Sequence, residues 1–127
     1  MFKTICKTII GTTAVMMISG YSFADTITFD DIYAAPDDAA LNLAYAQQQI
    51  GNGELLAAAS TLERLLLSKP NLDSVRLLYA AVLYRLNDQQ AANRELSLLD
   101  GKPLNDEQKA TLTRYKTEFK SPPPRQN

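Results

Sequence analysis

Two consecutive stretches of the chain, residues 39–72 and residues 73–106, share one pattern of side chains. When the first stretch is placed on the second without a gap, the same amino acid recurs at eight positions. A period of about 34 residues is typical of stacked helix–turn–helix repeats and predicts an all-α fold. Repeats of this kind hold other proteins more often than they transform small molecules. The identical pairs are Leu43 and Leu77, Tyr45 and Tyr79, Ala46 and Ala80, Ala57 and Ala91, Ala58 and Ala92, Leu62 and Leu96, Leu65 and Leu99, and Asn71 and Asn105.

The start of the chain, residues 1–24, has the pattern of a secretory signal peptide. Lys3 and Lys7 give a basic start, residues 9–18 are mostly apolar, and small residues flank Phe23 up to Ala24. We expect cleavage after Ala24 and export of the remaining chain.

A membrane anchor is the alternative interpretation of this segment. Gly11 and the two threonines after it interrupt the apolar stretch, which is much shorter than the roughly 20 residues that a membrane span needs. Cys6 precedes the apolar stretch, so it is not placed to become a lipid-bearing first residue. The sequence therefore predicts removal of the segment and indicates no lipid anchor.

The chain after the signal, residues 25–127, is small and lacks the side chains most common in enzyme and metal sites. It contains no cysteine, histidine or tryptophan. Removal of Lys3 and Lys7 from the 13 basic residues leaves 11 against 14 acidic ones, a net charge of −3. A mildly acidic chain without a basic stripe is a poor candidate for nucleic acid or anionic lipid. We expect no catalytic residues, no cofactor and no metal site, because pairs such as Asp30-Asp31 are consecutive and do not share a helix face.

The expected organisation has four parts: a signal peptide (1–24), an N-terminal segment (25–37), a helical domain (38–120) and a proline-rich, disordered tail (121–127). Within the domain, breakers and cap residues predict two helical hairpins followed by a terminal capping helix. The expected helices cover residues 39–50, 54–69, 72–86, 89–99 and 106–120.

Helical spacing also predicts which faces are apolar. In the N-terminal segment, Phe29, Ile32 and Tyr33 should form a turn or two of helix that lies over the end of the repeat, and Asp37 or Asp38 should cap the next helix. Each of four later helices has an expected apolar face. These faces are Leu41, Ala44, Tyr45 and Gln48 in the first helix of the domain; Ala58, Leu62, Leu65 and Leu66 in the second; Leu78, Tyr79, Val82 and Leu83 in the third; and Ala110, Leu112, Tyr115 and Phe119 in the terminal helix.

The repeat positions resemble those of the tetratricopeptide repeat (TPR) family. If each unit begins at Ala39 or Asp73, alanine falls at positions eight and twenty of both units, leucine at position twenty-four of both, and Pro70 at position thirty-two of the first. The family's tryptophan is replaced by Asn42 and Arg76, and its glycine by alanine. The resemblance implies TPR-like hairpins, two units plus a capping helix, in a short right-handed solenoid.

Residues 36–99, beginning PDDAALNLAYAQQQIGNGE, also resemble the periplasmic repeat segment that precedes the barrel of some Gram-negative outer-membrane proteins. Together with the predicted signal peptide, that resemblance implies a location in the periplasm, in association with the outer membrane or free of it. Two interpretations of the chain remain open: a freestanding relative of such a segment, or a relic of a larger protein whose barrel is lost.

In the TPR family the first helices of successive units line a concave groove. The resemblance implies a groove that binds a peptide or helix of an envelope partner. An alternative is that Leu43, Leu77 and Tyr84 pack beneath the N-terminal segment 26–33 or beneath the tail. A self-associating scaffold, and less readily an enzyme subunit, are the other functional alternatives. The groove residues are Leu43, Gln47, Ile50, Leu77, Ala81, Tyr84, Arg85, Thr111 and Tyr115.

Overall fold

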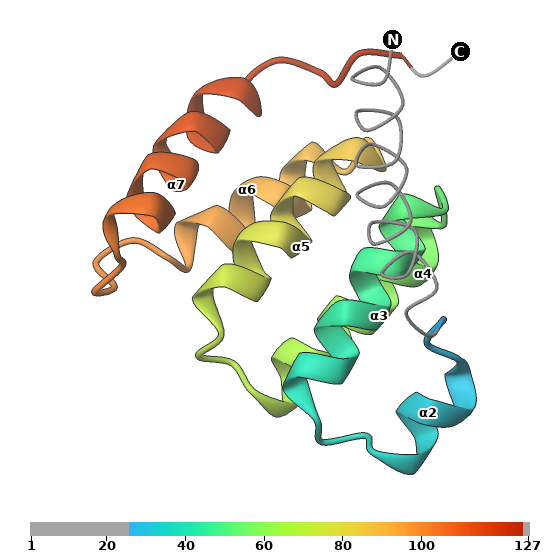
Figure 1. The fold of residues 1–127 in the computed structure, drawn as a ribbon. Helices are drawn as coiled ribbons and strands as arrows, with labels where there is room; N and C mark the ends of the chain where they lie inside the picture. The colour runs from blue at the N-terminus through green and yellow to red at the C-terminus, as the bar shows by residue number, and fades with distance from the viewer. Residues whose placement is uncertain (1–25, 126–127) are drawn as a thin grey trace, which may run out of the picture.

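The computed structural model describes residues 26–125, so the predicted signal peptide and the last two residues of the predicted tail lie outside the described residues. Over the described range the chain is all-helical, as predicted (Figure 1). None of the helices within residues 26–125 combines the length and the hydrophobicity that a membrane span requires. The helices are α2 (Phe29–Ala34), α3 (Ala39–Gly51), α4 (Leu55–Ser68), α5 (Asp73–Arg85), α6 (Gln89–Ser97) and α7 (Asp106–Glu118).

The helices pack as two hairpins and a terminal helix. Helix α3 packs mainly on α4, and α5 packs mainly on α6. Helix α4 joins the two hairpins through α5, and α7 lies against α5 and α6 (Figure 1). The predicted pairing of two helical units with a capping helix is therefore found in the structure.

The sequence repeat recurs in the backbone of the two hairpin turns. Each turn contains a left-handed residue at the equivalent place, Gly53 with φ 81° and Asn87 with φ 67°. The next residues, Glu54 and Asp88, each donate their backbone N–H to the carbonyl five positions earlier, at 2.8 and 2.9 Å. Glycine and asparagine suit these positions because they tolerate the left-handed conformation better than other residues.

Side-chain caps begin three of the long helices. The carboxylate of Asp38 accepts the Leu41 N–H at 3.0 Å, which selects Asp38 of the two predicted cap residues. The carboxylate of Asp88 caps α6 in the same way, and the side chain of Asn105 caps α7. Each cap satisfies a backbone donor that a helix start leaves free.

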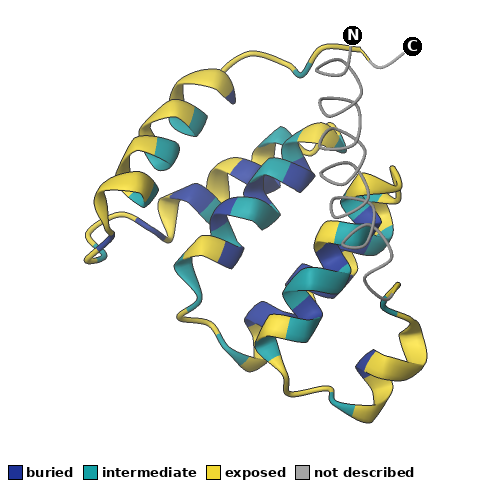
Figure 2. Cartoon of the chain, in the orientation of Figure 1, coloured by how far each residue is buried: buried dark blue, intermediate teal, exposed yellow. Residues whose placement is uncertain are grey.

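The hydrophobic core has two parts, one centred on α4 and one between α5, α6 and α7 (Figure 2). Four alanines at equivalent repeat positions are fully buried and allow the helix backbones to approach closely. The equivalent buried pairs are Ala46 and Ala80, Ala58 and Ala92, Leu62 and Leu96, and Leu65 and Leu99.

The equivalent residues Asn42 and Arg76 make the same kind of polar contact in the two units. The Asn42 Nδ2 donates to the carbonyl of Pro36 at 3.2 Å, and the Arg76 Nη2 donates to the carbonyl of Pro70 at 2.9 Å. Arg76 also forms an ion pair with Glu95, at 2.5 Å. A side chain at this position therefore ties the start of each hairpin to the segment before it.

The predicted inner face of α3 is wrong by about one residue. Leu41, Ala44, Tyr45 and Gln48 are only partly buried, whereas the buried residues include the polar Asn42 and Gln49. Gln49 can be buried because its Oε1 accepts the hydroxyl of Thr61 at 2.8 Å. A pattern that counts only apolar residues misses such satisfied amides.

The N-terminal segment forms the expected short helix, but only one of its three predicted apolar residues is buried. Ile32 is buried, whereas Phe29 and Tyr33 are 60% and 79% exposed. The side-chain amide of Gln48 holds the segment instead: its Oε1 accepts the Ile27 N–H at 2.9 Å and its Nε2 donates to the Ile27 carbonyl at 2.8 Å. Backbone pairing to this amide therefore replaces the predicted apolar cover.

A capping box begins α2. The Thr28 backbone N–H and hydroxyl donate to the Asp31 carboxylate at 2.8 and 2.7 Å. These two hydrogen bonds stabilise the ionised form and lower the pKa of Asp31 below its usual value.

Candidate protein-binding groove

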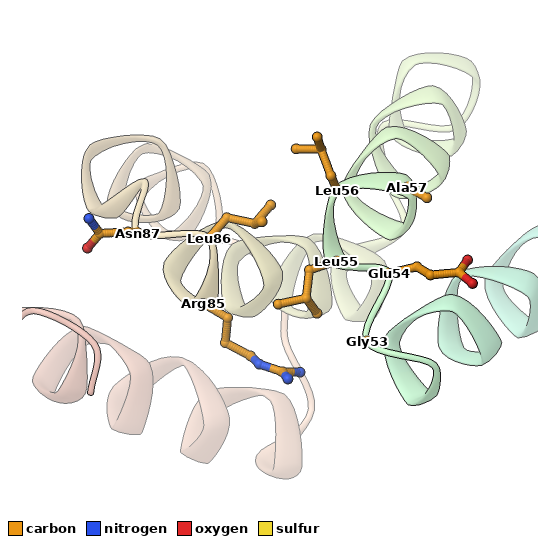
Figure 3. Close-up of a pocket in the computed structure, with 8 residues that line it drawn as sticks. All are labelled: Gly53, Glu54, Leu55, Leu56, Ala57, Arg85, Leu86 and Asn87. Atoms are coloured by element: carbon orange, nitrogen blue, oxygen red, sulfur yellow. The ribbon is translucent and has the colours of Figure 1, made fainter. Parts of the chain in front are cut away.

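Three adjoining depressions follow the junction of α4 with α5. The first has a volume of about 630 Å³ and lies between the start of α4 and the end of α5 (Figure 3). The second and third, of about 340 Å³ each, continue along α4 toward its end, where α6 contributes to the wall. The first two share Leu56 and Leu86, and the last two share Glu63 and Tyr79, so we treat them as one outer groove. The outer groove is lined by Gly53, Glu54, Leu55, Leu56, Ala57, Ala59, Ser60, Glu63, Leu66, Leu67, Pro70, Arg76, Tyr79, Leu83, Arg85, Leu86, Asn87, Asp88 and Glu95.

Figure 3 shows how the two helices supply the first end of this groove. The side chains of Leu56 and Leu86 project to the same side of the junction, where the second depression begins. Leu55 and Arg85 project to the other side. The apolar path therefore continues from Leu56 and Leu86 along α4.

Two exposed leucines stand on the α4 edge of the outer groove. Leu56 is 73% exposed and Leu67 is 80% exposed, and Glu63 lies between them on the same face of the helix. The equivalent positions of the second unit are occupied by Gln90 and Gly101, which are also exposed. Because the second unit packs without leucine at these positions, hairpin packing does not account for the two leucines.

Tyr79 lies at the centre of the outer groove. It is partly buried and packs against both parts of the hydrophobic core. Burial raises the pKa of Tyr79, and the carboxylates of Glu63, Glu95 and Asp88 raise it further, with a smaller opposing effect from Arg94. The phenol therefore lies in a partly desolvated and electrostatically negative place.

The raised pKa of Tyr79 predicts a fall in stability at high pH. The folded chain holds the phenolic proton more tightly than the unfolded chain does, so this contribution is complete below pH 10.0 and is lost as the pH rises through the folded pKa. Urea unfolding at a series of pH values should show this fall in the wild type. Tyr79→Phe should reduce the fall in stability. Glu63→Gln should reduce it less, because burial raises the pKa of Tyr79 more than the charge of Glu63 does. An identical fall in all three chains would contradict the assignment.

The predicted groove on α3, α5 and α7 does not form one surface. Leu77 is only 5% exposed and belongs to the core between α5, α6 and α7. Tyr84 stacks on Phe119 with a centroid distance of 4.1 Å, and its hydroxyl donates to the Ser121 carbonyl at 2.7 Å. Tyr84 therefore packs beneath the residues that follow α7, as the alternative interpretation held.

The other predicted groove residues are divided among separate places. Leu43 and Ile50 pack against the α4 part of the core, and Ala81 packs against the other part. Gln47 is exposed on α3, and Arg85 is exposed at the end of the outer groove. Thr111 and Tyr115 line a separate depression of about 230 Å³ between α5 and α7, together with Leu77.

Sequence reasoning missed Leu56 and Leu67, and it placed Tyr79 on the inward face of its helix without including it among the groove residues. The signal that could have found the two leucines is the comparison between units, because the second unit has Gln and Gly at the equivalent positions. No group of three or more potential metal ligands occurs within residues 26–125.

The fold and the groove define an all-helical protein built from two helical hairpins of one repeating pattern, with an open, partly apolar groove across their junction. Neither the protein-family models, nor the curated proteins, nor the solved structures provide a match to this chain.

Proposed function

We propose that the chain is an exported, TPR-like interaction module of the periplasm that binds a peptide or helix of an envelope or outer-membrane partner. The observation that carries this proposal is the outer groove, with two exposed leucines that hairpin packing does not require. Exposed apolar residues beside a polar rim are typical of protein-binding surfaces.

The length of the leucine edge suits a helical or extended segment. Leu56 and Leu67 are eleven positions apart on α4, which corresponds to roughly 16 Å along the helix axis. About three turns of a partner helix would cover this distance. The outer groove takes the place of the predicted groove, because core packing buries Leu77 and Phe119 covers Tyr84.

Two features support the TPR-like and exported parts of the proposal. The repeat relates both the side chains and the turn hydrogen bonds of the two hairpins. The basic start and apolar stretch within residues 1–24 support export.

Affinity capture from an envelope fraction tests the proposal. The wild-type chain should retain a partner that the double variant Leu56→Asp, Leu67→Asp loses, with binding weakened at least tenfold because two apolar contacts are replaced by charge. Tyr33→Ser is the matched control, because it alters an exposed apolar side chain away from the groove. Circular dichroism should show that all three chains keep their helices.

Two results would contradict this proposal. Equal capture by the wild type and the double variant would remove the outer groove as the site. Conversion of a dimer into a monomer by the double variant, without loss of any other partner, would favour the self-associating scaffold.

A further inference from the structure

The middle of the outer groove is more acidic than its ends. Glu63 is exposed and is common to the two depressions that meet there. Asp88 and Glu95 line the same two depressions from the α6 side. Within residues 26–125, Glu63 forms no ion pair, so its charge is available to a ligand.

The positive charges near this centre, Arg76 and Arg94, are outnumbered by its three carboxylates. Arg76 is already engaged by Glu95, at 2.5 Å, and by the Pro70 carbonyl. Arg85 lies at the far end of the groove and projects to the other side of the α4–α5 junction (Figure 3). A bound segment would therefore meet negative charge at the centre.

Tyr79 gives the same centre a second feature that suits a cation. Tyr79 lines both central depressions, and the three carboxylates act electrostatically on its phenol. An aromatic ring beside carboxylates is a favourable place for an ammonium or guanidinium group.

Resting on the proposed function, we infer that the outer groove binds an amphipathic peptide helix whose apolar residues contact Leu56 and Leu67 and whose Lys or Arg lies between Glu63 and Tyr79. Along α4, Glu63 follows Leu56 by seven positions and precedes Leu67 by four. A partner helix that lies along α4 would therefore need an apolar residue, a cationic residue and a second apolar residue at the same spacing. The order of the two intervals depends on whether the partner helix runs parallel or antiparallel to α4. The occupant is thus a basic segment of another protein.

A designed peptide tests this inference directly. The probe is a helical peptide of Ala and Gln with Leu at its first and twelfth positions and Lys at its eighth, and the matched peptide has Glu in place of Lys. A second pair with the order of residues reversed tests the opposite direction. Binding to the chain, expressed from its full sequence, is measured by fluorescence anisotropy at low and high salt. The Lys peptide should bind about five- to tenfold more tightly than the Glu peptide, and added salt should reduce the difference.

A charge exchange provides the control. The variant Glu63→Lys should prefer the Glu peptide, whereas Glu107→Lys, which changes an exposed acid on α7, should keep the wild-type preference. If both peptides bind the wild type equally but Leu56→Asp, Leu67→Asp abolishes binding, the inferred cation is wrong and the proposed function stands. If neither peptide binds and the double variant retains every captured partner, both are wrong.

Discussion

Replacement of Leu62 by alanine should destabilise the fold by about 2–5 kcal/mol. Leu62 is fully buried in α4 and packs within the core part that includes Ala46 and Val82. The substitution removes apolar contacts and leaves a cavity that the surrounding helices fill only partly. Because small domains have a total stability of about 5–15 kcal/mol, urea unfolding followed by circular dichroism should show a large fall in the transition midpoint.

The repeat supplies an internal test of this result. Leu96 occupies the equivalent position in α6 and is also almost completely buried, so Leu96→Ala should have a cost of the same order. The matched surface control is Leu67→Ala on α4, because its side chain is 80% exposed and should change stability little. Equal effects of Leu62→Ala and Leu67→Ala would contradict this packing.

The second large effect is expected at the end of α7, where Phe119→Ala should release this helix from the fold. Phe119 is buried and stacks on Tyr84 and Tyr115, at centroid distances of 4.1 and 4.9 Å. None of the residues within α7 itself is fully buried, so Phe119 is its chief apolar anchor. Loss of a buried phenylalanine is worth about 3–5 kcal/mol in a core that stays assembled.

Amide hydrogen exchange measures this release. Phe119→Ala should remove protection from α7, whereas α3 and α4 should keep theirs because α7 packs on α5 and α6. Lys120→Ala is the control, because it alters the exposed neighbour of Phe119. Tyr84→Phe should have a smaller effect, about 0.5–1.5 kcal/mol, since it keeps the ring and removes only the hydroxyl, which donates to the carbonyls of Ser121 and Glu118. Unchanged protection of α7 in Phe119→Ala would show that another contact anchors the helix.

The sequence was sufficient to predict the helices and their turns because local chemistry determines them. Asp38 and Asn105 supply side-chain caps, and Gly53 and Asn87 supply the left-handed turn residues. The fully apolar stripe of α4 was also predicted correctly: Ala58, Leu62, Leu65 and Leu66 are all buried.

Features that depend on how helices pack were predicted less well. The inner face of α3 includes Asn42 and Gln49, whose burial depends on hydrogen-bond partners outside their own helix turn. The predicted groove took Leu77 and Tyr84 as exposed, but the position of α7 covers both. The outer groove was missed because its lining comes from three helices, and no spacing within one helix indicates their arrangement.

Asn42 and Arg76 donate to the carbonyls of Pro36 and Pro70. These contacts explain how the two repeat units can differ in sequence and still keep an equivalent hydrogen bond to the segment before each hairpin. The acceptor in each contact is a main-chain oxygen, which every amino acid carries. Substitution of the residue that carries this carbonyl therefore leaves the acceptor in place. Any side-chain donor long enough to reach the carbonyl can make the contact, whether it is an amide or a guanidinium. A repeat joined through its backbone tolerates divergence of its side chains.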